Sequence, residues 1–224
     1  MTWKQFAFGF RVDPAKAPPD SAVILLHDLG ATSASLASVA TVWGALMPRT
    51  AFIAVDGIEQ LEPPSYGSTE PAVLDRTARR LDPVVERQLR TFRPAVGRVM
   101  IAGFGYGGTL ALHMLLSHGW EGAGVLAVNA RLTRPLVRTI KARSKVRLVE
   151  CTNDCASEQS RVREFAASLA AAGVDVRQTC LADSALSDEA IRRAGAYLVE
   201  LASEHSPVAH TGIAHVSQTL CVRT

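Results

Sequence analysis

Apolar residues follow two patterns that alternate along the chain as far as residue 203. Short runs that are apolar at every position are typical of buried parallel strands, because helices cover both faces of a parallel sheet. Longer segments with apolar residues every three or four positions predict amphipathic helices. The expected strands span residues 6–12, 22–26, 51–55, 98–102, 124–128, 146–150 and 174–181, and the expected helices span about 32–46, 70–92, 109–116, 157–172 and 187–203.

This alternation predicts βαβ units and therefore an α/β fold, with a mostly parallel central sheet and helices on both faces. A chain of 224 residues, 48% of them hydrophobic, suits one such domain. We expect the domain to span residues 1–203 and residues 204–224 to form a C-terminal tail. The three histidines of the tail lie five residues apart, on no common helix or strand face, so no metal site is expected.

Composition narrows the class of protein further. The net charge of +3 is small, and four cysteines without a C-x-x-C motif are too few for a disulfide scaffold. The first residues contain neither a basic start nor a long apolar core, and no apolar run approaches the length that crosses a bilayer. We therefore expect a cytoplasmic protein with reduced thiols, no transmembrane segment and no cofactor.

The expected helix at 70–92 is rich in arginine. Its arginines are interleaved with Asp75, Asp82 and Glu86, a mixture of charges that favours an ordinary solvated face. Pro83 is expected to interrupt or kink this helix, because proline lacks the backbone N–H that a helix interior needs.

A second basic segment, residues 131–147, contains no acidic residue. Two interpretations stay open: the segment guides anionic ligands, or it is a solvated helix at the domain edge. Nucleic acid is not an expected partner, because no aromatic residues interleave with these charges. Three of the arginines are spaced to share one helix face and are the candidate anion-binding residues: Arg131, Arg134 and Arg138.

The sequence RVMIAGFGYGGTLAL at 98–112 joins an expected strand to an expected helix through closely spaced glycines. A strand that feeds a helix through G-x-x-x-G is the turn on which an α/β-hydrolase holds its nucleophile. The middle residue of that pattern is Gly105, which has no side chain to serve as one.

A second motif, VILLHDLGATSAS at 23–35, completes a resemblance to a known family. It looks like the strand and L-H-G-L-G segment of the phospholipase/carboxylesterase family of α/β-hydrolases, which includes the acyl-protein thioesterases. The glycine motif looks like the G-F-S-Q-G-G elbow of the same family. The resemblance extends from about Val23 to Ser203 and implies an α/β-hydrolase fold.

The resemblance also implies where a catalytic triad would lie, and none of its three residues is present. A serine hydrolase needs a nucleophile, a histidine that accepts its proton and an acid that orients the histidine. The nucleophile position is Gly105, and the acid of the family's G-D-x-D motif corresponds to Ala156. The histidine position falls at about Ala185, and no histidine occurs between His118 and His205. Three losses together indicate a catalytically degenerate member.

Other parts of the family's pocket are expected to remain. By the resemblance, the backbone N–H groups of Leu29 and Tyr106 are the oxyanion donors, and they can hold an anion or a carbonyl. His27 is a structural neighbour of this site, and Asp28 replaces a family glycine and brings a carboxyl group to it. The Tyr106 side chain either fills the emptied cleft or offers a stacking surface. Glycine suits position 105, because the centre of an elbow has a positive φ that strains other residues.

The leading functional hypothesis is a pseudo-hydrolase that binds a small acyl or anionic ligand, or a protein partner; a homodimer is a further candidate assembly. The alternative is an active serine-type ester or thioester hydrolase with displaced catalytic residues.

A minor alternative is dinucleotide binding. The motif Gly103-x-Gly105-x-x-Gly108 fits G-x-G-x-x-G, and Arg131 is placed to meet a 2′-phosphate, but no acidic residue follows the next strand to hold a ribose. Cys151 and Cys155 flank the lost acid and are expected to be buried, inert thiols.

Overall fold

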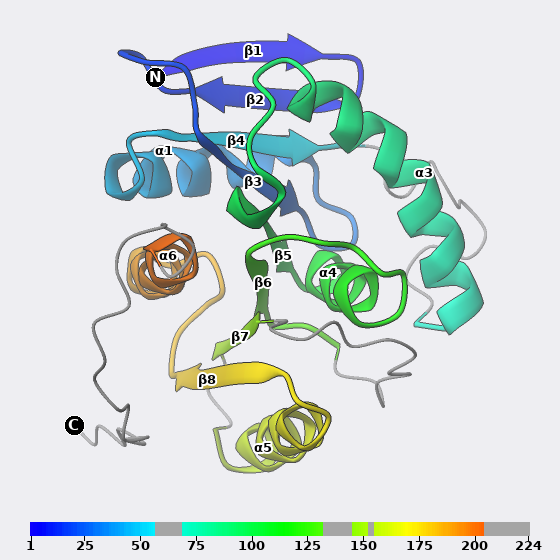
Figure 1. The fold of residues 1–224 in the computed structure, drawn as a ribbon. Coiled ribbons are helices and arrows are strands. Elements are labelled where there is room, and N and C mark those ends of the chain that lie inside the picture. Colours follow the sequence, from blue (N-terminus) through cyan, green and yellow to red (C-terminus); the bar gives the residue numbers. More distant parts are fainter. Residues whose placement is uncertain (57–68, 132–144, 152–154, 204–224) are drawn as a thin grey trace, which may run out of the picture.

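The computed structural model describes residues 1–56, 69–131, 145–151 and 155–203, and every statement about the fold refers to these residues. They form an eight-stranded sheet in the order β1-β2-β4-β3-β5-β6-β7-β8, with helices on both faces (Figure 1). The strands are β1 (Thr2–Phe6), β2 (Gly9–Asp13), β3 (Ser21–Leu26), β4 (Thr50–Val55), β5 (Val99–Phe104), β6 (Gly124–Val128), β7 (Lys145–Cys151) and β8 (Asp175–Leu181). The helices are α1 (Ala37–Leu46), α3 (Pro71–Leu89), α4 (Tyr106–Leu116), α5 (Cys155–Ala171) and α6 (Asp188–Ser203), with short 3-10 helices at η1 (Ser33–Leu36) and η3 (Val96–Arg98).

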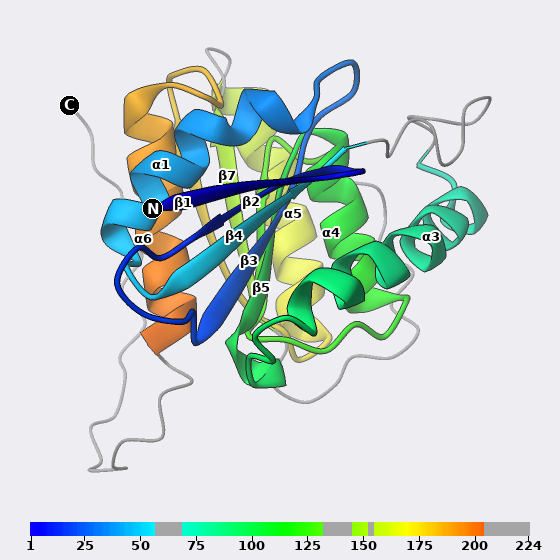
Figure 2. The ribbon, with the colours of Figure 1, turned by 90° about the horizontal axis from the view of Figure 1, so that it is seen from above.

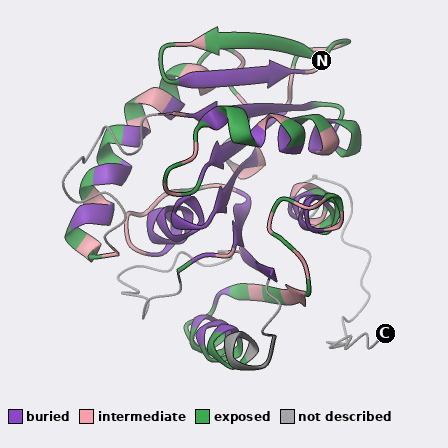
Figure 3. Ribbon diagram, turned by 180° about the vertical axis from the view of Figure 1, so that it is seen from behind, coloured by how far each residue is buried: buried purple, intermediate pink, exposed green. Residues whose placement is uncertain are grey.

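The sheet is parallel from β4 to β8, and only β1 and β2 run antiparallel to their neighbours. The predicted α/β fold with a mostly parallel sheet is therefore confirmed. The central strands β3, β4, β5 and β6 are buried at every residue, which explains their continuous apolar sequences (Figure 3).

Two hydrophobic cores lie on opposite faces of the sheet. Helices α1 and α6 cover one face, and α3, α4 and α5 cover the other (Figure 2). Trp43 of α1 anchors the first core, because its indole Nε1 donates a hydrogen bond of 2.7 Å to the carbonyl oxygen of Ile191 in α6. Helix α4 is buried along its whole length and sits at the centre of the second core.

The single strand expected at 6–12 is instead a hairpin of β1 and β2, and this prediction was wrong. Gly9 is paired with Phe6 across the turn and has a φ of 132°, which favours glycine. A Cβ at Gly9 would also lie 2.0 Å from the carbonyl oxygen of Ala54 on the neighbouring strand. The turn was hidden because apolar residues flank it on both sides.

Pro83 does not interrupt the arginine-rich helix, so that part of the expectation was wrong. Helix α3 continues through Pro83 as far as Leu89, and Pro83 lies on its exposed side. On that side, water can bond to the carbonyl that lacks its helical partner.

None of the helices in the described part of the chain is both long and apolar enough to cross a membrane.

Candidate functional site

The three positions that the resemblance matches to the family's triad lie, with Asp28, at one edge of the sheet. Asp28 follows β3, Gly105 follows β5, Ala156 follows β7, and Ala185 follows β8. These strands are parallel, so their carboxyl ends meet at the same edge. Open α/β sheets bind ligands at this edge, which makes it the candidate functional site.

Gly105 forms the sharp turn between β5 and α4. Its φ is 54° and its ψ is −118°, a conformation that strains any residue with a side chain. Its N–H donates a hydrogen bond of 2.8 Å to the carbonyl oxygen of Val128 on β6, and its own carbonyl accepts one of 3.1 Å from the N–H of Thr109. The turn is thus held from both sides and has the positive φ expected of an elbow.

The carboxylate of Asp28 lies directly over this turn. Its Oδ1 atom accepts hydrogen bonds of 2.7 Å from the backbone N–H of Leu29 and 2.7 Å from that of Tyr106. Both N–H groups expected to act as oxyanion donors therefore already have an anionic acceptor from the chain itself. Tyr106 is the first residue of α4, so the carboxylate also lies favourably at the positive end of that helix.

The same carboxylate occupies the space that a side chain at position 105 would need. A Cβ on Gly105 would lie 2.0 Å from both Cγ and Oδ1 of Asp28 and 2.2 Å from its Oδ2. Contacts this short cannot coexist, so Asp28 in this position requires glycine at 105. Asp28 is nevertheless exposed to solvent on its other side.

His27 and Tyr106 contribute mainly to the interior. His27 is fully buried, and its Nδ1–H donates a hydrogen bond of 2.8 Å to the carbonyl oxygen of Asp28. The Tyr106 side chain is fully buried and belongs to the core between the sheet and α3, α4 and α5. It therefore fills the interior and offers no stacking surface to a ligand.

The other two positions that the resemblance matches to the triad are alanines. Ala156 lies in the first turn of α5, which begins at Cys155. Ala185 lies between β8 and α6 and packs against the core that α1 and α6 share. Nearby, Ser187 hydroxyl donates to Asp183 Oδ2 at 2.6 Å, and that bond lowers the pKa of the Asp183 carboxyl.

Cys151 at the end of β7 is not an activated nucleophile. Its side chain is buried, and burial, with the nearby Glu150 charge, raises the pKa of the thiol to about 12. The thiol therefore stays protonated at neutral pH, as expected for an inert cysteine. The side chain of Cys155 is outside the described residues, and Cys180 on β8 is partly exposed.

Two polar residues that sequence reasoning did not single out brace this edge. Asn129 follows β6 and has a φ of 49°. Its side-chain Oδ1 accepts a hydrogen bond of 2.6 Å from the N–H of Cys151, and its Nδ2 donates one of 3.2 Å to the carbonyl oxygen of Cys151. The hydroxyl of Thr109 accepts a hydrogen bond of 2.9 Å from the N–H of Arg131. The sequence did hold a signal for this turn, because an asparagine directly after a buried strand indicates a residue with positive φ, which asparagine tolerates.

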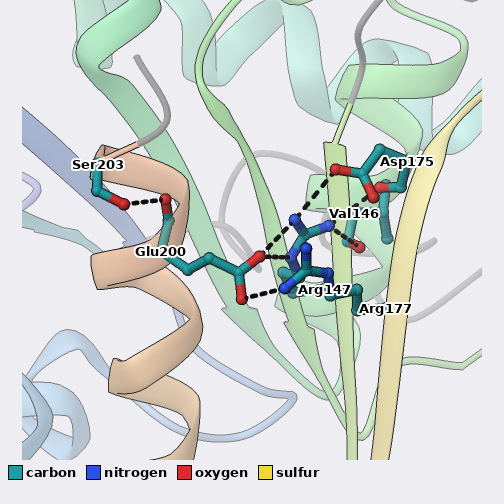
Figure 4. A network of polar contacts seen from close by, with 6 residues as sticks. All are labelled: Val146, Arg147, Asp175, Arg177, Glu200 and Ser203. Carbon is teal, nitrogen blue, oxygen red and sulfur yellow. Dashed lines mark hydrogen bonds and ion pairs between the residues drawn. The ribbon is translucent and has the colours of Figure 1, made fainter. Parts of the chain in front are cut away.

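The structure describes only residues 131 and 145–147 of the basic segment, and Arg147 is buried instead of lying on the surface. Arg134 and Arg138 lie outside the described residues, and Arg131 is exposed. Arg147 is fully buried between β7 and α6, where its Nη2 donates to Glu200 Oε1 at 2.7 Å and Asp175 Oδ2 at 3.1 Å (Figure 4). Arg147 is therefore committed to the interior and cannot belong to a basic surface.

The described residues hold no group of three histidine, cysteine, aspartate or glutamate side chains arranged to bind a metal ion.

Comparison with known proteins agrees with this architecture. Residues 8–159 match the model of the Phospholipase/Carboxylesterase family. No curated protein sequence matches the chain. Among solved structures, YahD in complex with malic acid superposes with a TM-score of 0.66 at 18% identity, over 85% of this chain and 97% of that one.

A carboxylesterase from Bacillus cereus superposes with a TM-score of 0.65 at 17% identity, over 85% of this chain and 93% of that one. TT1662 from Thermus thermophilus gives 0.66 at 14% identity, over 90% of this chain and 98% of that one. At these identities the solved structures show only that the fold is shared. The match to the family model shows that the chain is related to the family. The chain therefore belongs to the phospholipase/carboxylesterase family and has its α/β-hydrolase fold.

Proposed function

We propose that this chain is a non-catalytic member of its family, which acts by binding and does not hydrolyse esters. The observation that carries the proposal is the contact of Asp28 with the elbow. One carboxylate both accepts the two N–H groups that would stabilise an oxyanion and fills the space of a nucleophile's side chain. Both requirements of acyl transfer, a nucleophile and a vacant oxyanion site, are absent from this arrangement.

The same contact bears on the ligand. An external anion at the N–H groups of Leu29 and Tyr106 would have to displace a tethered carboxylate and would meet its negative charge. The pyrophosphate of a dinucleotide would face the same competition. Of the candidate ligands, a small anion or acyl carbonyl at these donors is thus disfavoured, and a protein partner is favoured.

A direct test measures hydrolysis of a short p-nitrophenyl ester and labelling by a fluorophosphonate. The natural chain should not exceed buffer and should not be labelled. The variant Gly105→Ser/Ala156→Asp/Ala185→His should also stay inactive, because Asp28 still overlaps the new side chain. Adding Asp28→Gly to that variant empties both the overlap and the oxyanion donors, so labelling of the new serine is expected only there.

Three results would contradict the proposal or the role that it gives to Asp28. Turnover by the natural chain that the fluorophosphonate abolishes would establish an active hydrolase with a displaced nucleophile. Turnover that a thiol reagent abolishes would identify one of the cysteines instead. Gain of labelling by the variant that keeps Asp28 would contradict the role given to that carboxylate.

A further inference from the structure

Helix α3 lies at the flank of the molecule, outside α4 (Figures 1 and 2). One side of the helix is buried against the sheet and α4 at a regular helical spacing that runs from Val73 to Val85. The opposite side is rich in positive charge. Five arginines of this side are exposed, and we call them the arginine face: Arg76, Arg79, Arg80, Arg87 and Arg90.

Two of the three acids that alternate with these arginines in the sequence are only partly exposed and contact histidines at the neighbouring helix. Asp75 is partly buried, and its Oδ1 lies 2.7 Å from Nε2 of His113 in α4. Asp82 Oδ2 lies 2.8 Å from Nε2 of His118, just after α4. Glu86 is exposed beside the arginines, and 47% of the Asp82 side chain is exposed as well. The arginines are exposed, as expected for a solvated face, and two of the three interleaved acids lie beside His113 of α4 and His118 just after it.

The arginine face has a regular geometry. Arg76, Arg80, Arg87 and Arg90 are separated by four, seven and three residues, so they follow one stripe along the helix. At about 1.5 Å of rise per residue, the stripe is about 21 Å long. Arg90 is paired with Glu86 at 2.7 Å, an exposed contact that a competing carboxylate can exchange.

We propose that the arginine face of α3 is a docking surface for a protein partner that presents a row of carboxylates, such as an acidic helix. Guanidinium groups pair with carboxylates through two parallel hydrogen bonds, and a stripe of them selects a partner of complementary charge and spacing. This surface lies on α3 and not at the Asp28 contact, so the inference goes beyond the proposed function and does not depend on it.

Two other classes of partner fit the face less well. Helices that lie on membranes bury large apolar side chains in the bilayer, but the apolar side of α3 is already buried in the core. None of the exposed large apolar residues in the described part of the chain belongs to α3. Single-stranded nucleic acid is held by aromatic side chains, and the sequence of α3 contains none.

The probe for this surface is a fluorescent helical peptide of about 15 residues, long enough to span the stripe. Its glutamates are spaced by four and three residues, and a second peptide carries glutamine at the same positions. Anisotropy with the full chain should show binding of the glutamate peptide only, weakening as salt is added. The variant Arg80→Gln/Arg87→Gln should lower the affinity about tenfold, because two charged pairs are lost.

A matched control removes the same charge elsewhere. Arg192 and Arg193 are exposed on α6 and pair with Glu189 at 2.9 and 2.7 Å. Arg192→Gln/Arg193→Gln should change the affinity by no more than about twofold, and circular dichroism should show both variants folded. Absence of peptide binding, or equal loss in both variants, would overturn the proposal. So would tighter, α3-dependent binding of phosphatidylserine vesicles or duplex DNA than of the peptide.

Discussion

The carboxylate of Asp28 and the bare α-carbon of Gly105 share one small volume above the turn from β5 to α4. The carboxylate stabilises the first turn of α4, and such caps contribute about 1 kcal/mol. Glycine at 105 avoids a positive-φ strain on the order of 1–3 kcal/mol and leaves the carboxylate its place. A change at either residue should therefore alter the cost of a change at the other.

A double-mutant cycle measures this dependence. Gly105→Ala should lower the free energy of unfolding by about 3 kcal/mol, from backbone strain and overlap together. In the background of Asp28→Gly the same change should cost at least about 1 kcal/mol less, because the overlap is gone and only strain remains. Urea unfolding of the four chains gives the coupling energy.

Gly119→Ala is the control for backbone strain alone. Gly119 has a φ of 80° and no atom within 4 Å of a Cβ built on it. Gly119→Ala should therefore lower the free energy of unfolding by less than Gly105→Ala does, and by the same amount with Asp28 or glycine at position 28. Additivity of the Asp28 and Gly105 changes to within about 0.5 kcal/mol would show that the two residues do not interact.

Helix α6 is attached to strands β7 and β8 by ion pairs as well as by apolar packing. Glu200 of α6 accepts hydrogen bonds from Arg147 of β7 and lies 2.8 Å from the guanidinium of Arg177 of β8 (Figure 4). Arg147 is fully buried, so its charge needs these partners. The network explains how a fully buried arginine is accommodated in β7.

Glu200→Gln tests the network at the scale of the element. Loss of the carboxylate leaves the Arg147 charge poorly compensated in the interior, which should destabilise the chain by about 3 kcal/mol. Glu189→Gln, on the exposed face of the same helix, should cost no more than about 0.5 kcal/mol although it also removes two ion pairs. Similar losses in thermal or urea unfolding for the two variants would contradict the special role of Glu200.

At the scale of the whole molecule, the sheet has a fully buried centre and partly exposed margins. Strands β3, β5 and β6 are buried at every residue, whereas β1 is mostly exposed and β8 is buried at none of its residues (Figure 3). Opening of the strands at the margins exposes less apolar surface than opening of the central strands, so it should cost less free energy.

Hydrogen exchange should follow this gradation. Amides of β3, β5 and β6 should exchange most slowly and report global unfolding, while hydrogen-bonded amides of β1 and β8 should exchange at least about tenfold faster. Mass spectrometry of the native chain in deuterated buffer gives the order. Equal protection of β1 and β5 would show that the hairpin opens only with the entire sheet.

Much of this architecture could be predicted from the sequence, because the buried strands have continuous apolar runs and glycines mark the elbow. The hairpin at Gly9 escaped because residues on both sides of its turn are apolar. The direction of Asp75 and Asp82 escaped because pairing with His113 and His118 depends on how α3 lies against α4. The Asp28 contact escaped for the same reason, since 78 residues separate it from Tyr106 and no local pattern reports where a side chain points.

The overlap above Gly105 also links positions 28 and 105 in any later change of the site. While the Asp28 carboxylate accepts the N–H groups of Leu29 and Tyr106, a side chain at position 105 has no room. A serine at 105 therefore needs the carboxylate to leave this place or to be replaced. Loss of the nucleophile is in this way reinforced by a second residue, and a serine at the elbow regains vacant oxyanion donors only when residue 28 changes or moves as well.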